Sequence, residues 1–368
     1  MSAFILIALS VWAGLNGYAF WRASIVASVL RVPMWCWWSL ALFCWVSFPA
    51  SRWLRLGMPR VSGALEDFSS MWVGTLFLVC FCLLVADLAT LGGVLWKVHL
   101  LKIRGAALVV AVVLTVIALV QGHRMPVVRE ESVVLPGLPR ERDGLRVVFM
   151  SDLHLGRTIG KSWLLALKDQ VSALKPDLIA IGGDLIDHDA ERVQPLVQDL
   201  QKFQAPLGVW TVLGNHDVYA GPQESAGIMK AAGYKLLQDD SELAAPGLRI
   251  AGVDDLGFRG RSGSPDAAVR HALSEVQRGQ EGCIYISHTP EAIQTASDAG
   301  AGLMLCGHTH GGQIWPFSYL VQRRFPTIGG RYLFGAMSLI VSRGAGTWGP
   351  RMRLWRPGEI YLITLRAP

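Results

Sequence analysis

Four long apolar segments, separated by short polar stretches, occupy the first 121 residues of the chain. Each is close to the roughly 20 residues that an α-helix needs to cross the hydrocarbon core of a bilayer. Tryptophans lie near several segment ends, as in the aromatic belts of membrane proteins. We therefore predict a transmembrane region of about four helices over residues 1–121. The segments are Phe4–Phe20, Val32–Ala50, Met71–Trp96 and Ala106–Gln121.

Basic residues in this region flank the apolar segments. Residues 1–120 hold eight basic and three acidic side chains, which account for +5 of the net charge of +6 of the whole chain. A net positive charge is also found in nucleic-acid-binding proteins, but basic residues beside apolar helices are typical of membrane-flanking loops. We therefore predict a membrane bilayer as a partner and no nucleic acid.

The basic residues balance across the predicted membrane. When Arg124 and Arg129 after the fourth segment are included, five lie on each side. The short loop Lys97–Gly105 is purely basic, which slightly favours a domain outside the cytoplasm after the last helix. Asp87 is an isolated carboxylate within the third apolar segment. We predict that it has a role in helix packing, although ionisable groups at this depth are often functional.

From Leu145 onward, short apolar runs alternate with amphipathic stretches. Residues 122–144 are more polar and contain turn sequences, so we predict a linker and domain entry there and one domain over residues 145–368. Strands that alternate with helices predict an α/β fold whose sheet is covered on both faces. The predicted strands are Leu145–Met150, Leu178–Ile181, Val209–Leu213, Arg249–Val253, Ile284–Ile286, Leu303–Cys306, Leu339–Val341 and Ile360–Thr364.

Five of these strands are followed directly by Asp, Asn or His. The carboxyl ends of strands in an open α/β sheet face one crevice, so these side chains are expected to converge. One Asp or Asn at a strand end is explained by a turn, but five clusters of nitrogen and oxygen ligands predict a metal site. His188 and His271 lie outside the pattern and are predicted to be surface histidines. The clusters are Asp152 with His154, Asp184, Asn215 with His216 and Asp217, His288, and His308 with His310.

The last cluster, Gly307-His308-Thr309-His310, places two histidines one residue apart on a glycine-bounded turn. Imidazole is the commonest metal ligand in proteins, and this spacing allows two neighbouring ions to be bound. No Cys-x-x-Cys pair occurs among the six cysteines, so neither a zinc ribbon nor a disulfide framework is predicted.

The ordered set of motifs resembles the calcineurin-like metallophosphoesterase family. The resemblance covers Leu145 to the C-terminus and not the first 120 residues. Within the family, the first motif Ser-Asp-Leu-His-Leu-Gly and the last motif Gly-His-Thr-His-Gly-Gly-Gln resemble those of a membrane-associated bacterial phosphohydrolase branch. The resemblance implies a four-layer α-β-β-α sandwich, here preceded by the transmembrane helices, in a bacterial cytoplasmic (inner) membrane. The motifs are Asp152-x-His154, Gly183-Asp184, Gly214-Asn215-His216-Asp217, His288 and Gly307-His308-Thr309-His310.

The resemblance also implies two divalent metal ions with defined ligands. One ion would be held by Asp152, His154 and His310, the other by Asn215, His288 and His308, and Asp184 would bridge them. Ligands that are all nitrogen or oxygen suit Mn²⁺, Fe or Zn²⁺ better than Mg²⁺ alone, and we expect Mn²⁺.

In the family's chemistry, a metal-bridging hydroxide attacks phosphorus. His216 matches the family's non-ligand histidine, which protonates the leaving oxygen or binds the phosphate. We predict that Asp217 orients this imidazole, with an ordinary turn carboxylate as the alternative.

These features predict a membrane-anchored dinuclear-metal phosphohydrolase, either a phosphodiesterase or a pyrophosphohydrolase, with lipid-linked phosphates as a candidate substrate class. Relatives of this branch include enzymes that cleave UDP-diacylglucosamine, a candidate substrate that requires a cytoplasmic active site. The loop Ile314–Leu320, with Arg323 and Arg324 beyond it, is expected either to bind lipid headgroups or to cover the core. The alternative function is a non-catalytic membrane receptor or scaffold with a phosphate-sensing metal site, against which the complete ligand set and His216 argue.

Overall fold

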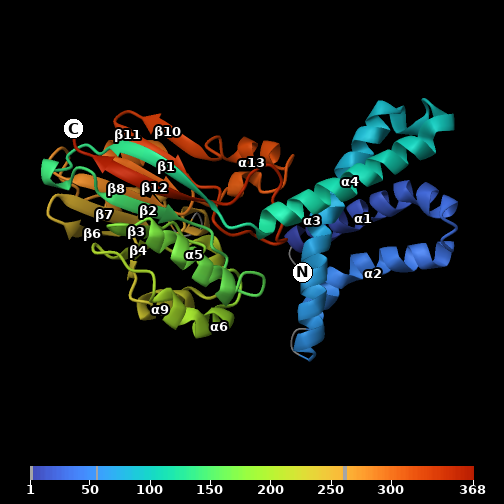
Figure 1. The fold of residues 1–368 in the computed structure, drawn as a ribbon, viewed down its shortest axis with the longest axis horizontal. Helices are drawn as coiled ribbons and strands as arrows, with labels where there is room; N and C mark the ends of the chain where they lie inside the picture. The colour runs from blue at the N-terminus through green and yellow to red at the C-terminus, as the bar shows by residue number, and fades with distance from the viewer. Residues whose placement is uncertain (1–2, 55–56, 260–262) are drawn as a thin grey trace. The chain divides into compact units, whose positions relative to one another are not determined.

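The computed structural model describes residues 3–54, 57–259 and 263–368 (Figure 1). The chain forms two compact units. One comprises residues 1–123 together with Gly349–Leu354, and the other comprises Arg124–Trp348 together with Trp355–Pro368. A short segment near the C-terminus therefore belongs to the N-terminal helical unit.

The helical unit contains four long helices, as the apolar pattern predicts. The third ends seven residues earlier than expected, because Gly92 and Gly93 adopt φ values of +71° and +99° that an α-helix cannot accommodate. Trp96, expected at the end of that helix, lies beyond it. The helices are α1 (Ala3–Val29), α2 (Met34–Trp53), α3 (Pro59–Ala89) and α4 (Leu100–His123).

Among the described residues, two helical stretches are long and apolar enough to cross a membrane, by length and composition alone. They are Arg60–Ala89, with a mean hydropathy of 2.2, and Lys97–His123, with 2.6. Within the described residues, α1 and α2 are not among the stretches that meet this criterion. The expectation of about four membrane helices is thus supported for two of them.

Asp87 is not the isolated carboxylate that its sequence context suggests. Its carboxylate lies 2.7 Å from Nε of Arg22 on α1 and 3.1 Å from a guanidinium nitrogen of Arg104 on α4. The hydroxyl of Tyr18 donates to it at 2.9 Å. Asp87 and Arg104 are both 7% exposed, so the network is buried and joins three helices. The predicted packing role of Asp87 agrees with these contacts.

We expect Asp87→Asn to destabilise the helical unit by about 3 kcal/mol, because it removes the carboxylate from two guanidinium groups and leaves their charges buried. The apparent melting temperature of the full chain in detergent checks this. Glu66→Gln, on the same helix α3, is the matched control and should change it little. An unchanged melting temperature for Asp87→Asn would show that the network contributes no stability.

The segment Gly349–Leu354 packs on the C-terminal part of α4. The backbone N–H of Arg353 donates to the carbonyl of Ala118 at 2.9 Å. A Cβ at Gly122 would lie 2.4 Å from the carbonyl oxygen of Arg351, so only glycine fits at that position.

The second unit contains two six-stranded sheets with mixed strand directions. All eight predicted strands are present, with ends shifted by a few residues. In the first sheet the order is β1 (Val127–Val134), β12 (Glu359–Arg366), β2 (Arg146–Met150), β3 (Leu178–Ile181), β4 (Val209–Thr211) and β5 (Lys235–Leu236). In the second it is β10 (Gly330–Phe334), β11 (Met337–Val341), β9 (Leu303–Cys306), β8 (Gly282–Ser287), β7 (Leu248–Val253) and β6 (Asp240–Ala245).

Side chains that point alternately to the two faces of each sheet pack into three separate hydrophobic cores. Val147 and Phe149 of β2 pack with Ile284 and Ile286 of β8 in a core shared by the two sheets. Successive side chains of a strand point to opposite faces, so Val148 instead joins a core beneath helices. The expected four-layer α-β-β-α arrangement is present.

The outer helical layers differ in size. Figure 1 shows α5, α6 and α9 gathered on one side of the domain, where they cover the first sheet. The helices over the first sheet are α5 (Lys161–Ala173), α6 (Ala190–Val193), α7 (Val197–Leu200) and α9 (Pro222–Ala231). Those over the second are α11 (Pro265–Ala272) and α12 (Ile293–Ala299).

The stretch predicted to be a linker, residues 122–144, contains strand β1. It pairs in parallel with β12 along its whole length, from Val127 opposite Glu359 to Val134 opposite Arg366. The apolar pattern misses this strand because Arg129-Glu130-Glu131 interrupts it. Such charges are tolerated because β1 is an edge strand of its sheet.

Candidate metal centre

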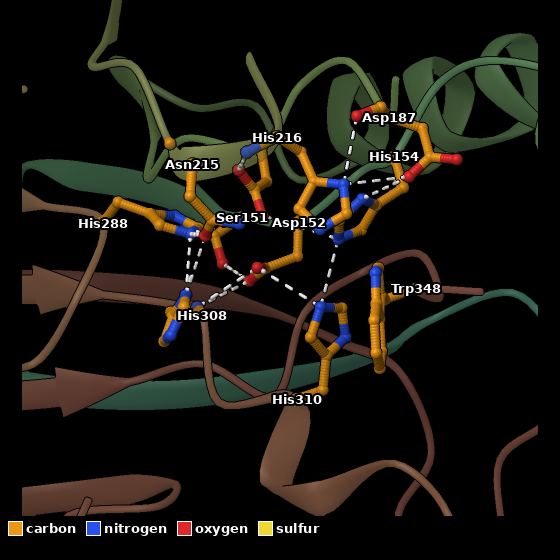
Figure 2. A network of polar contacts seen from close by, with 12 residues as sticks. Ser151, Asp152, His154, Asp187, Asn215, His216, His288, His308, His310 and Trp348 are labelled. Atoms are coloured by element: carbon orange, nitrogen blue, oxygen red, sulfur yellow. Dashed lines mark hydrogen bonds and ion pairs between the residues drawn. The ribbon is translucent and has the colours of Figure 1, made fainter. Parts of the chain in front are cut away.

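The five predicted clusters meet at the carboxyl ends of parallel strands, and Figure 2 shows labelled residues of four of them close together. Strands β2, β3 and β4 run parallel in one sheet, and β8 and β9 run parallel in the other. Asp152 and His154 follow β2, Asp184 follows β3, and Asn215 begins α8 (Asn215–Tyr219) after β4. In the second sheet, His288 follows β8, and His308 and His310 follow β9.

Several of these residues have an unusual backbone conformation. Five of the seven predicted ligands have a positive φ, between 48° and 69°, in the left-handed region that non-glycine residues seldom adopt. Such conformations cost on the order of 1 kcal/mol or more each and persist where function requires the side-chain direction. They indicate that this loop cluster is built for a site. The residues are Asp152, His154, Asp184, His308 and His310.

The first donor group consists of Asp152, His154 and His310. Nε2 of His154 lies 3.1 Å from Nε2 of His310. The same nitrogen of His310 lies 3.5 Å from Oδ1 of Asp152. All three residues are buried, and their donor atoms lie within 4.8 Å of one another, a spacing that suits ligands of one metal ion.

The second donor group consists of Asn215, His288 and His308. Oδ1 of Asn215 lies 3.1 Å from Nε2 of His288 and 3.0 Å from Nδ1 of His308. The two ring nitrogens are 3.2 Å apart. Nδ1 of His288 lies 2.8 Å from the carbonyl of Gly182, which can accept its proton and leave Nε2 free to bind a metal.

Asp184 lies between the two groups. Its Oδ2 is 3.7 Å from Nε2 of His154 in the first group and 3.2 Å from Nε2 of His288 in the second. Its Oδ1 accepts the backbone N–H of His216 at 2.8 Å. A carboxylate that bridges two metal ions must lie between their other ligands, as Asp184 does.

The electrostatics of the centre favour added positive charge. Burial raises the pKa of Asp152. Burial alone would lower the pKa of His288, yet the carboxylates of Asp184 and Asp152 raise it well above the ordinary value. Burial, together with the charge on His288, lowers the pKa of His308 to about 3. Ring nitrogens that face each other at 3.1–3.2 Å are stabilised by a cation between them. The residues therefore fit two divalent metal ions.

Asp187 belongs to the centre, although it was not among the predicted residues. Its Oδ1 lies 3.3 Å from Nδ1 of His154, 3.1 Å from Nδ1 of His216 and 2.9 Å from Nδ1 of His188. Burial alone would raise the pKa of Asp187, but these three imidazoles hold it well below its usual range. His188 is exposed, as predicted, and its ring packs edge-on against His216 with centroids 4.4 Å apart.

The contacts of Asp217 agree with the alternative given for it, a turn carboxylate, and not with an orienting partner of His216. Its carboxylate accepts backbone N–H groups of Gly214 at 2.9 Å and Ile186 at 2.8 Å. It thereby joins the loops after β3 and β4. The imidazole of His216 is instead oriented by Asp187, through both its carboxylate and its backbone carbonyl, which lies 3.0 Å from Nδ1. A signal for Asp187 existed in the sequence, because it follows Asp184 by three residues in the same strand-end loop.

We expect Asp187→Asn to lower activity and metal affinity by about 10–100-fold, the usual cost of removing a carboxylate that orients metal-binding histidines. Titration of metal into the apo-protein and steady-state kinetics measure the two effects. Asp189→Asn is the matched control, because Asp189 pairs with Arg192 on the neighbouring helix. Equal behaviour of the two variants would exclude an orienting role for Asp187.

Residues 145–312 match the family model described as calcineurin-like phosphoesterase. The chain is 31% identical over 230 residues to an uncharacterized metallophosphoesterase of Aquifex aeolicus, an alignment that covers 61% of this chain and 85% of that protein. The chain belongs to the calcineurin-like phosphoesterase family. The predicted family and the predicted class of metal-dependent phosphoesterase are confirmed at this level.

Two other metallophosphoesterases extend the comparison. An uncharacterized metallophosphoesterase of Campylobacter jejuni is 31% identical over 246 residues, covering 66% of this chain and 64% of that protein. A zebrafish transmembrane protein with metallophosphoesterase domain is 31% identical over 279 residues, covering 71% and 62%. The chain thus spans less than two thirds of the length of these two relatives.

Proposed function

We propose that this metallophosphoesterase is a membrane-anchored phosphohydrolase that uses two divalent metal ions to cleave a phosphodiester or pyrophosphate bond. The observation that carries the proposal is the position of Asp184 between two groups of three donors, within 3.7 Å of a histidine in each. A phosphate-sensing receptor needs a metal site, but it does not need a histidine such as His216 held beside that site.

In this proposal, Asp152, His154 and His310 hold one ion and Asn215, His288 and His308 hold the other, with Asp184 shared. When bound, two such ions neutralise phosphoryl oxygens and lower the pKa of a water molecule toward neutrality. The nitrogen and oxygen donors favour Mn²⁺, with Fe or Zn²⁺ as the alternatives.

His216 is proposed to donate a proton to the leaving oxygen. Asp187 engages its Nδ1 through a backbone carbonyl at 3.0 Å and a carboxylate oxygen at 3.1 Å. This contact orients the ring and leaves Nε2 as the atom that exchanges a proton with substrate. The ring packs edge-on against that of His154, with centroids 4.6 Å apart, which keeps it beside the first donor group.

Membrane anchoring is supported by the surface of α4. Its valines are apolar yet largely exposed, and an apolar surface of this extent is unfavourable in water. We propose a multi-pass protein of the bacterial inner membrane. The valines with at least 49% exposure are Val109, Val110, Val112, Val113, Val116 and Val120.

The proposed substrate class is a lipid-linked phosphoester. Residues Ser318–Arg324, in the stretch expected to bind headgroups or to cover the core, form helix α13. Tyr319 and Leu320 are 63% and 56% exposed, so they do not serve to cover the core. Arg323, in the last turn of the helix, suits anionic headgroups, whereas Arg324 beside it pairs with Glu291.

Metal-dependent turnover tests the proposed function. The full chain, purified and freed of metal by chelation, is expected to regain hydrolysis of bis(p-nitrophenyl) phosphate with Mn²⁺ and to bind two ions per chain. A protein that binds no metal would refute the site, and one that binds two ions without turnover would favour a receptor. A C-terminal reporter read on both sides of the membrane would assign the face.

A further inference from the structure

Three aromatic side chains form an exposed border next to His216. The ring of Tyr219 lies 5.7 Å from the His216 ring and that of Trp348 lies 6.3 Å from it. Phe258 extends the border, with its ring 6.4 Å from that of Tyr219. The three residues are 59%, 49% and 55% exposed, respectively, and we call them the aromatic rim. Figure 2 shows the indole of Trp348 beside His310.

Local contacts hold the aromatic rim in place. The backbone N–H of Trp348 donates to Oε1 of Gln313 at 2.9 Å, and its carbonyl accepts from Nε2 of the same side chain at 2.8 Å. Gln313 lies three residues after the metal-binding His310. The backbone N–H of Phe258 donates to the buried carboxylate of Asp255 at 2.9 Å. Tyr219 is the last residue of α8, the helix that begins with Asn215.

A cluster of exposed aromatic rings beside a catalytic centre marks a surface for an apolar group. The ring planes cross at 62° between His216 and Tyr219, 78° between His216 and Trp348 and 69° between Tyr219 and Phe258. None of these pairs has the parallel ring faces between which a planar nucleobase could stack. Hydrocarbon packs without such a geometric requirement, and the exposed apolar face of α4 points to a lipid environment for the chain.

We infer that the aromatic rim binds the hydrocarbon part of the leaving group, so that the substrate is a phosphoester whose leaving oxygen carries an alkyl or acyl-bearing group. The inference rests on the proposed function, because it places this group on the side of His216. In the reaction, the bond between phosphorus and the leaving oxygen breaks and a bond from a water oxygen to phosphorus forms. The leaving oxygen takes a proton from His216, which the water replaces.

Binding of two phosphate monoesters tests the inference. Methyl phosphate and hexyl phosphate are titrated calorimetrically into the Mn²⁺-loaded full chain in lipid nanodiscs, which avoids alkyl detergents. Wild type is expected to bind hexyl phosphate about tenfold more tightly than methyl phosphate. Tyr219→Ala and Trp348→Ala should bring the two affinities close together without changing that for methyl phosphate. Tyr219→Phe keeps the ring and should retain the preference.

Leu333→Ala, which removes an exposed apolar side chain from β10, is the second control and should also retain the preference. A preference that survives Tyr219→Ala and Trp348→Ala, or that is lost in Leu333→Ala alone, would overturn the inference. Tighter binding of phenyl phosphate than of hexyl phosphate would identify a planar ligand and overturn it as well. Failure of the proposed function is distinguishable, because it removes turnover of bis(p-nitrophenyl) phosphate and leaves the hexyl preference intact.

Discussion

Replacement of Asp184 by asparagine is expected to release both metal ions and to lower kcat/KM by about 10³-fold or more. Asp184 contributes to both donor groups, at 3.7 Å from His154 and 3.2 Å from His288. Asparagine preserves the size of the side chain and an oxygen that can accept the His216 N–H, but it removes the negative charge. Metal ions in such sites lower the barrier by several kcal/mol, which corresponds to this loss of rate.

Metal content by mass spectrometry, measured together with kcat/KM, checks this prediction. Asp199→Asn is the matched control, because Asp199 is also a buried carboxylate but pairs with Lys161 and Lys202 outside the metal centre. It should retain two ions and full activity. Loss of one ion only from Asp184→Asn would show that Asp184 belongs to a single metal site and would contradict its bridging position.

The two donor groups follow from one regularity of α/β folds. Strands β2, β3 and β4 are parallel, so the polar residues after them necessarily reach the same edge of the sheet. Asp152, Asp184 and Asn215 could therefore be grouped without knowing which strands are neighbours. The assignment of ligands to one ion or the other came from the family resemblance, because the positions of strand ends do not indicate which donors share an ion.

Residues outside this regularity were harder to predict. Asp217 adjoins His216 in sequence, but the turn of α8 directs its carboxylate to the backbone amides of Gly214 and Ile186. Asp187, 29 residues before His216, orients the imidazole instead. Trp348 reaches the same imidazole from a loop that follows β11 and carries no ligand motif. Such contacts depend on where loops fold back, which local patterns do not encode.

The helical unit illustrates the same limit. Apolar length predicts that α1 and α4 exist, but not that Arg22 and Arg104 meet the carboxylate of Asp87. The contact of two guanidinium groups with one buried carboxylate can be predicted only when the packing of the helices is known. Edge strand β1 was missed for a related reason, since its charged centre is acceptable only at the margin of a sheet.

His216→Gln is expected to lower kcat by about 10²–10⁴-fold while the protein keeps both metal ions. The side chain lies beside the first donor group, with its ring 4.6 Å from that of His154, and Asp187 orients it through Nδ1. Removal of a proton donor costs most when the leaving oxygen is basic. The loss should therefore be larger for an alkyl leaving group than for p-nitrophenol, whose anion leaves readily without a proton.

Kinetics are measured with bis(p-nitrophenyl) phosphate and with a dialkyl phosphodiester. Combined with metal analysis, they separate the two roles considered for His216, proton donation and phosphate binding. His271→Gln on α11 is the control, because His271 is exposed and lies outside the donor groups. Equal losses for both leaving groups would assign His216 to phosphate binding rather than to proton donation. Loss of a metal ion from His216→Gln would instead make it a ligand, a role that its contact distance to Asp184 and His154 also permits.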